Sequence, residues 1–223
     1  MAATILILVG ISALCVLLLV NKVRNDPREV RDMYAGHTEN QKQVIRYFKI
    51  DKQGCLKDKL WTDADFDNYL QEKIRNTKQK ALDKLSIDEE QVKEIDPINF
   101  QNRLYYDEMT KSYALRKTGE DGIRRSSIYQ AVWLFFSAKQ ILVCKINLNL
   151  IDDTVKDKEY EYFYKDVTNI SIEEMSDADG IENYMMFKII VPGAEFSCNL
   201  YDYDDDEERS VKAMRALLRE KKS

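Results

Sequence analysis

Residues 127–150, SIYQAVWLFFSAKQILVCKINLNL, carry the strongest structural signal in this chain of 223 residues. Apolar side chains recur at every second position on both sides of a polar break at residues 137–139, which is the spacing of β-strands. After the break, Ile141 and Val143 share one face, and the opposite face begins with Leu142. The pattern predicts two antiparallel strands joined by a short turn.

The segments around this hairpin continue the strand pattern. Further strands are predicted at residues 159–172, 184–191 and 195–203, with a Pro-Gly turn between the last two. The sequence GEDG at residues 119–122 predicts an earlier hairpin. We expect about six to eight strands in all.

Tyrosines cluster in the first of these later strands. Tyr160, Tyr162 and Tyr164 alternate with Glu161 and Phe163, so the three tyrosines share one strand face. Such a cluster is either part of a core or a surface that grips a ligand. A strand that is half-covered by a core explains the alternation more simply, and we therefore predict a core position.

The composition changes to helical spacing at residues 204–223, DDDEERSVKAMRALLREKKS. Asp204 and Glu207 have the spacing of a capping box, and the acidic start and basic end complement the helix dipole. The apolar positions at helical spacing are Val211, Met214, Leu217 and Leu218. We predict an amphipathic helix that closes the strand region.

Residues 36–96 also have helical periodicity, with three N-capping signals. These helix starts are predicted at Thr38, Thr62 and Ser86, each followed three residues later by Gln, Asp or Glu. The second helix carries apolar positions as far as residue 85, and the third ends before Pro97. The acidic run at its second start lacks the Gly and Glu of a calcium loop, so helix capping is the preferred interpretation.

Residues 2–20, AATILILVGISALCVLLLV, contain no charged side chain. A helix of about 19 residues is roughly 28 Å long, close to the hydrocarbon thickness of a bilayer. A cleaved signal peptide would have basic residues before the apolar run, whereas this chain begins MAAT. We predict a single-pass membrane anchor.

Cations follow the apolar run and none precede it. Lys22, Arg24, Arg28 and Arg31 lie just after the predicted anchor, and the positive-inside rule then places the bulk of the chain in the cytoplasm. The predicted location is the cell membrane, with one N-terminal helix inserted.

The strand–turn–strand FFSAKQILVCK at residues 135–145, followed by FYKDVTNISI at residues 163–172, resembles bacterial PH-like and GRAM-like domains. In those families an aromatic residue, an acidic residue and an apolar–Thr/Ser–Asn/Ser–Ile stretch recur before the later strands. The resemblance implies the pleckstrin-homology superfold, an antiparallel β-barrel or sandwich capped by a C-terminal helix. It also suggests a bacterial source.

The expected fold class is α+β with three parts. These are a transmembrane anchor at residues 1–21, a juxtamembrane helical region at residues 22–96 and a PH-like domain at residues 97–223.

Basic residues flank the GEDG turn. In lipid-binding PH domains a basic cluster at the first hairpin holds headgroup phosphates, and the resemblance makes Arg116, Lys117, Arg124 and Arg125 candidate contacts for anionic lipid. Glu120 and Asp121 at the tip would repel a phosphate, so a solvated hairpin is the simpler interpretation.

Little in the sequence suggests catalysis. His37 is the single histidine, no nucleophile or phosphate-loop motif accompanies it, and the four cysteines form no CxxC pair. We predict no enzyme activity, no cofactor and no metal, and the formal net charge of −5 argues against nucleic-acid binding.

The expected function is that of a membrane-anchored interaction or scaffold protein that presents its PH-like domain to a protein partner. A lipid-headgroup sensor is the first alternative, and an uncharacterised enzyme is the second.

Overall fold

The computed structural model describes residues 28–50, 60–176, 183–201 and 203–222. The chain divides into two compact units, residues 1–66 and 67–223. The predicted membrane anchor at residues 1–21 lies outside the described residues. Within the described ranges, no helix combines the length and the apolar character needed to cross a membrane.

The first unit contains α2 (Arg28–Asp32), α3 (Glu39–Lys49) and the first turn of α4 (Asp63–Arg75). The predicted start of α3 is confirmed, because the Thr38 hydroxyl and the Gln41 side chain each accept a hydrogen bond from the other residue's backbone N–H. The Tyr47 ring stacks on Phe66 with centroids 4.6 Å apart. The Tyr47 hydroxyl donates to Asp63 over 2.8 Å.

The helix predicted from residue 62 to residue 85 is two helices, α4 and α5 (Thr77–Leu85). Its predicted start is confirmed by the reciprocal hydrogen bonds between Thr62 and Asp65. The predicted start at Ser86 is wrong: Ser86 adopts φ 54° and ends α5 instead. The next cap is Asp88, which exchanges hydrogen bonds with Gln91 and begins the short 3-10 helix η2 (Glu89–Gln91).

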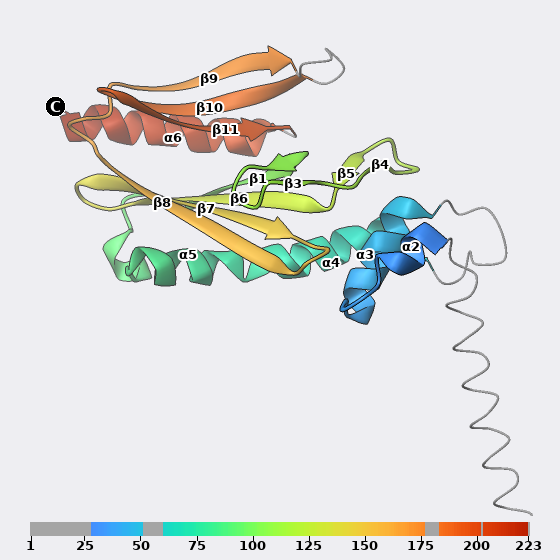
Figure 1. The fold of residues 1–223 in the computed structure, drawn as a ribbon. Helices are drawn as coiled ribbons and strands as arrows, with labels where there is room; N and C mark the ends of the chain where they lie inside the picture. The colour runs from blue at the N-terminus through green and yellow to red at the C-terminus, as the bar shows by residue number, and fades with distance from the viewer. Residues whose placement is uncertain (1–27, 51–59, 177–182, 202, 223) are drawn as a thin grey trace, which may run out of the picture. The chain divides into compact units, whose positions relative to one another are not determined.

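Seven longer strands in the described residues form two antiparallel sheets (Figure 1). The four-stranded sheet has the order β1 (Ile98–Leu104), β6 (Ile128–Phe136), β7 (Gln140–Asn149) and β8 (Thr154–Phe163). The three-stranded sheet has the order β11 (Ala194–Leu200), β10 (Asn183–Val191) and β9 (Asn169–Ser176). The central prediction is confirmed, because β6 and β7 pair antiparallel across the turn at residues 137–139.

Two small hairpins lie between β1 and β6 along the chain. One is formed by β2 (Tyr106–Asp107) with β3 (Ser112–Tyr113), and the other by β4 (Arg116–Thr118) with β5 (Arg124–Ser126). The second is the hairpin predicted from GEDG, and Gly122 takes the left-handed conformation that the turn requires, at φ 80°. The first was not predicted, because two-residue strands carry almost no periodic signal.

The two faces of the four-stranded sheet are covered differently. α5 packs against β6 and β7 on one face, where the Trp133 indole N–H donates to the Thr77 hydroxyl over 2.9 Å. The other face turns toward the three-stranded sheet and α6 (Asp205–Lys222) (Figure 1). Lys84 of α5 and Asp157 of β8 form an ion pair at 3.1 Å.

One hydrophobic core lies between the two sheets and α6. It includes Tyr162 and Tyr164, so the predicted core position of these two tyrosines is confirmed. The Tyr164 hydroxyl donates to the carbonyl of Ser137 over 2.9 Å, which satisfies the buried phenol. Tyr160 is only partly buried at the margin of this core.

The predicted start and apolar face of α6 are confirmed. Asp204 accepts hydrogen bonds from the backbone N–H groups of Asp206 and Glu207, both at 2.9 Å. The four apolar positions predicted for the helix are all buried in the core. Among the described strands no ladder joins the two sheets into a closed barrel, so the PH-like barrel stays a prediction.

Candidate functional site

The inner face of the four-stranded sheet changes from apolar to polar along its strands. Strand register places the polar side chains of β1, β6, β7 and β8 in two adjacent rows. One row contains Asn102, Gln130 and Asn147, and the next ends in Lys145 opposite Lys158. Further along the same face, the residues belong to the hydrophobic core.

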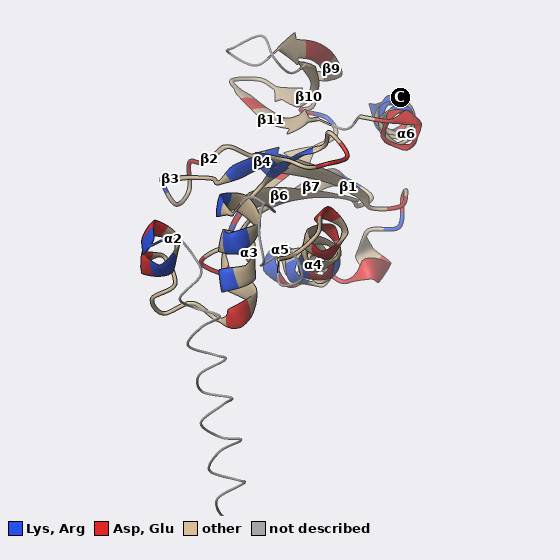
Figure 2. Cartoon of the chain, turned by 90° about the vertical axis from the view of Figure 1, so that its right-hand side faces the viewer, with Lys and Arg blue, Asp and Glu red and all other residues tan. Residues whose placement is uncertain are grey.

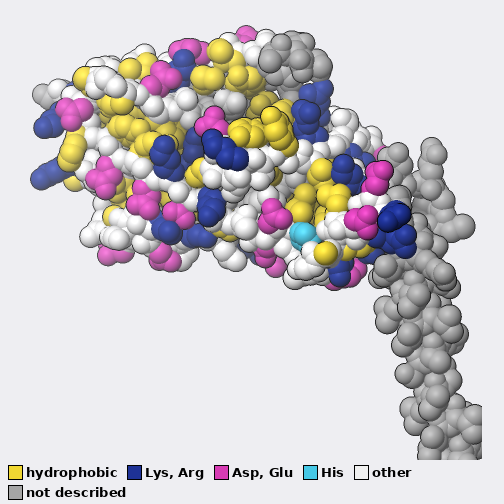
Figure 3. All heavy atoms as spheres, in the orientation of Figure 1, with side chains coloured by type: hydrophobic (Ala, Val, Ile, Leu, Met, Phe, Trp, Pro, Cys, Tyr) yellow, Lys and Arg dark blue, Asp and Glu magenta, His cyan; other side chains and the backbone are white. Residues whose placement is uncertain are grey.

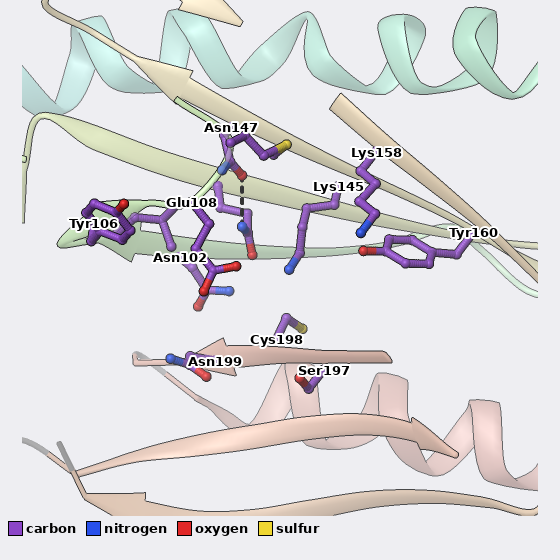
Figure 4. Close-up of a pocket in the computed structure, with 13 residues that line it drawn as sticks. Asn102, Tyr106, Glu108, Lys145, Asn147, Lys158, Tyr160, Ser197, Cys198 and Asn199 are labelled. Atoms are coloured by element: carbon purple, nitrogen blue, oxygen red, sulfur yellow. Dashed lines mark hydrogen bonds between the residues drawn. The ribbon is translucent and has the colours of Figure 1, made fainter. Parts of the chain in front are cut away.

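A cavity of about 340 Å³ lies over these polar rows. The inner face of the four-stranded sheet forms one side, β11 forms the opposite side, and the loop after β2 forms a margin (Figure 4). The side chains that matter for its chemistry are Asn102, Gln130, Asn147, Lys145, Lys158, Tyr160, Cys198 and Glu108. In Figure 3, the band between the two sheets carries hydrophobic side chains with Lys and Arg among them.

A chain of side-chain amides forms part of the cavity wall. The Gln130 amide N–H donates to the Asn147 side-chain oxygen over 2.8 Å (Figure 4), and the Asn147 amide N–H donates to the Asp107 carboxylate over 2.7 Å. Asp107 also accepts from the backbone N–H of Met109 and from the Thr110 hydroxyl. These bonds fix Gln130 and Asn147 in place.

Asn102 differs from its neighbours in this row. Its side chain is 2% exposed, and neither its amide nitrogen nor its amide oxygen has a hydrogen-bond partner among the described residues. Figure 4 shows this amide directed into the space between the four-stranded sheet and β11. Most buried polar groups in proteins are paired, so Asn102 offers a donor and an acceptor to a molecule in the cavity.

Two lysines supply the positive charge of the cavity. Lys145 and Lys158 are direct cross-strand partners in the β7–β8 ladder, a placement in which like charges repel. In the described part of the chain neither ammonium forms an ion pair, and each lies over an aromatic ring, Lys145 over Phe196 and Lys158 over Tyr160. A ring face attracts a cation but leaves its charge uncompensated.

The cavity thiol is protonated at neutral pH. Cys198 is 4% exposed, and burial raises the pKa of its thiol to about 12. A thiol is nucleophilic mainly as the thiolate, so Cys198 serves as a small apolar wall residue.

The predicted lipid contacts lie elsewhere, on the β4–β5 hairpin, where Figure 2 shows basic residues on β4. Arg116 is exposed and lies 4.9 Å from the centroid of the Tyr105 ring, whereas Lys117 and Arg124 are half-buried. The structure thus brings all four predicted residues onto one hairpin, but it does not leave all four accessible.

Arg125 is the buried member of this group, at 2% exposure. Its guanidinium donates twice to Asp67, at 2.7 Å each, and twice to Asp121, at 2.9 and 2.6 Å. The hydrogen bonds from Arg125 hold the pKa of Asp121 well below its ordinary value of 3.8. Arg125 therefore ties the hairpin to α4, and a lipid phosphate would have to displace two carboxylates to reach it.

The cavity residues were missed in the sequence, although a signal was present. Lys145 and Asn147 continue the face of Ile141 and Val143, so this face changes from apolar to polar along the strand. The sequence does not show that polar positions on four strands meet at one level, because that depends on strand register.

Comparison with protein-family models, with curated proteins and with solved structures finds no match for this chain. The residues of the site are therefore the basis for a functional proposal.

Proposed function

We propose that this chain is a membrane-anchored, non-enzymatic binding protein. Residues 97–223 form its PH-like binding domain, the cavity between the two sheets receives a protein partner, and the bulk of the chain lies on the cytoplasmic side of the cell membrane. The observation that carries this proposal is the polar end of an otherwise apolar core face, left open as a cavity of about 340 Å³. A cavity of this size with a few convergent polar groups is typical of a binding site.

Burying polar groups on a core face lowers the stability of the fold, so the needs of folding do not explain why these groups are there. Asn102 lies on the same side of β1 as the core residue Phe100, where an apolar side chain would continue the packing. A binding role supplies a reason to keep an amide there, because a partner can complete its hydrogen bonds.

The available groups favour binding over bond-making. The amides and the tyrosine orient a ligand, the lysines attract charge, and the protonated Cys198 thiol is a poor nucleophile. The order of elements, with antiparallel strands followed by a closing helix, supports the PH-like part of the proposal. The uncharged run at residues 2–20 supports the anchor.

Lipid-headgroup sensing is the competing role. It would depend on Arg116, Lys117 and Arg124, since Arg125 is held by Asp67 and Asp121. The cavity and this hairpin use different residues, so one experiment can separate the two roles.

Site-specific photocrosslinking of the full chain in native membranes tests the proposal. A benzoylphenylalanine at Glu108, on the cavity margin, should give a discrete protein adduct. The same residue at Glu161, an exposed position on β8 outside the cavity lining, is the matched control and should not give that adduct. Equal adducts at both positions, or none at Glu108, would contradict the proposed role of the cavity.

A further inference from the structure

We propose that the group received by the cavity is an anionic oxygen group, a carboxylate or a phosphate, held between Lys145 and Lys158. The proposal rests on the binding function proposed above and adds the chemical class of the ligand. Its basis is the arrangement of two facing cations, one unpartnered amide and a cavity that reaches all three.

The two lysines carry positive charge that the described residues do not neutralise. Lys145 and Lys158 lie opposite each other, line one cavity and, within the described residues, form no ion pair. An anion between them would turn a repulsive pair into two attractive contacts. Glu108 is the single carboxylate among the lining residues, and it is exposed on the margin rather than paired with either lysine.

Asn102 can form the hydrogen bonds that an acidic ligand needs. The Asn102 amide N–H can donate to an anionic oxygen, and its side-chain oxygen can accept from a hydroxyl or an amide of the same ligand. Gln130 donates to Asn147, and Asn147 donates to Asp107, so Asn102 is the member of this row that remains to be satisfied. The three groups select a ligand with an acidic end and a polar body.

The size of the cavity limits what can enter it. A volume of about 340 Å³ is at the lower end of the range for small-molecule sites, so it admits a small acid or one acidic side chain but not a folded segment. Leu104, Met109 and Tyr160 add apolar contact area to the same cavity. The anionic group therefore enters alone or on a short tether.

Thermal unfolding of the detergent-solubilised full chain tests the anion site. Inorganic phosphate and acetate are titrated separately against potassium chloride at matched ionic strength. At least one of the two should raise the unfolding midpoint, because a ligand that binds only the folded state stabilises it. Comparing the two anions shows whether the site prefers a phosphate or a carboxylate.

Matched variants locate the effect. In Lys145→Gln and in Lys158→Gln the apparent affinity for the effective anion should fall by about tenfold or more, the loss of one charge-assisted hydrogen bond. Lys139→Gln makes the same charge change at an exposed turn outside the cavity and should keep the affinity. Glu108→Gln removes the nearby negative charge and should raise the affinity.

Two results would contradict the anion site, and two others identify the molecule that carries the acidic group. No shift with either anion, or the same shift in Lys145→Gln as in the parent chain, would overturn the anion site. An adduct at position 108 that persists in that case would still support partner binding. If an anion binds and the adduct at position 108 disappears in Lys145→Gln, the protein partner carries the acidic group. If an anion binds and the adduct persists in Lys145→Gln, a separate small acid carries it.

Discussion

At the scale of single residues, Asn102 carries an energetic penalty in the free chain. A buried amide without a partner loses its hydrogen bonds to water and gains none in return, which costs about 1–3 kcal/mol. On the same face, the neighbouring residues along β1 are apolar. The neighbouring side chains in the adjacent strands are hydrogen-bonded to each other. Packing therefore does not explain why an asparagine occupies position 102, and a substitution can show what the amide contributes.

We predict that Asn102→Leu raises the free energy of unfolding by about 1 kcal/mol or more, because an apolar side chain removes the unpaired amide and extends the core. It should also weaken anion binding. Chemical denaturation of the full chain in detergent measures the first effect. Asn99→Leu is the control on the same strand, since the Asn99 amide already donates to the carbonyl of Val132. A loss of stability in Asn102→Leu would show that the amide is satisfied in solution.

Single residues also show which parts of the site could be predicted from the sequence. The alternation predicted that Ile141 and Val143 share one strand face, and the structure places both in the hydrophobic core. Lys145 and Asn147 continue that face by simple spacing, yet their meeting with Lys158 and Asn102 required the register of three separate strand pairs. Register is set by long-range pairing, which local patterns do not encode.

At the scale of elements, the β4–β5 hairpin depends on one buried cation. Arg125 bonds Asp121 at the hairpin turn and Asp67 of α4, which lies 58 residues away in the sequence, so it joins the hairpin to the helix. GEDG correctly predicted the hairpin, but Arg125 was predicted to be a surface contact for lipid. Nothing in the local sequence indicates which of the basic residues points inward. The carboxylate partner lies in the helical region, far outside any local window.

We predict that Arg125→Met frees the hairpin from α4 and increases backbone amide exchange in β4 and β5, while β6 and β7 keep their protection. Hydrogen–deuterium exchange with peptide resolution measures both. Arg116→Met, at an exposed position on the same hairpin, should leave exchange nearly unchanged. Uniform exchange across the hairpin and the sheet in Arg125→Met would contradict this separation.

The same ion pair gives a direction for pH dependence. The pKa of Asp121 is lower in the folded chain than its ordinary value of 3.8, so its contribution to stability is present above that pH. The contribution is lost as the pH falls below 3.8, and the hairpin should therefore loosen in acid. In Arg125→Met this acid-dependent step should be smaller but still present, because the backbone N–H of Ile123 also donates to Asp121 and lowers its pKa.

At the scale of the whole molecule, the order of elements was predictable and their assembly was not. The helical start, the strand region and the closing helix follow from periodicity and capping at residues such as Thr38 and Asp204. α5 was expected in the helical region before residue 97, yet it packs on the outer face of the four-stranded sheet. The apolar face of an amphipathic helix predicts that the helix packs against another part of the protein, but it does not predict which part.

We predict that the full chain remains in the membrane fraction after extraction with alkaline carbonate, and that a variant lacking residues 1–21 moves to the soluble fraction. About 19 uncharged residues bury enough apolar surface in a bilayer for stable insertion. Fractionation followed by immunoblotting measures the distribution. Recovery of the full chain in the soluble fraction without detergent would contradict the anchor.

The two described cysteines give this fold a pair of natural reporters. Cys144 lies on the face of the four-stranded sheet that α5 covers, whereas Cys198 lies in the core between the sheets, and both thiols are buried and free. An alkylating reagent reaches Cys144 only when the covering helix lifts, whereas it reaches Cys198 through the cavity that this thiol lines. The labelling rate of Cys144 therefore reports how often α5 lifts from the sheet, and the rate of Cys198 reports access to the cavity. A molecule bound in the cavity should slow only the labelling of Cys198.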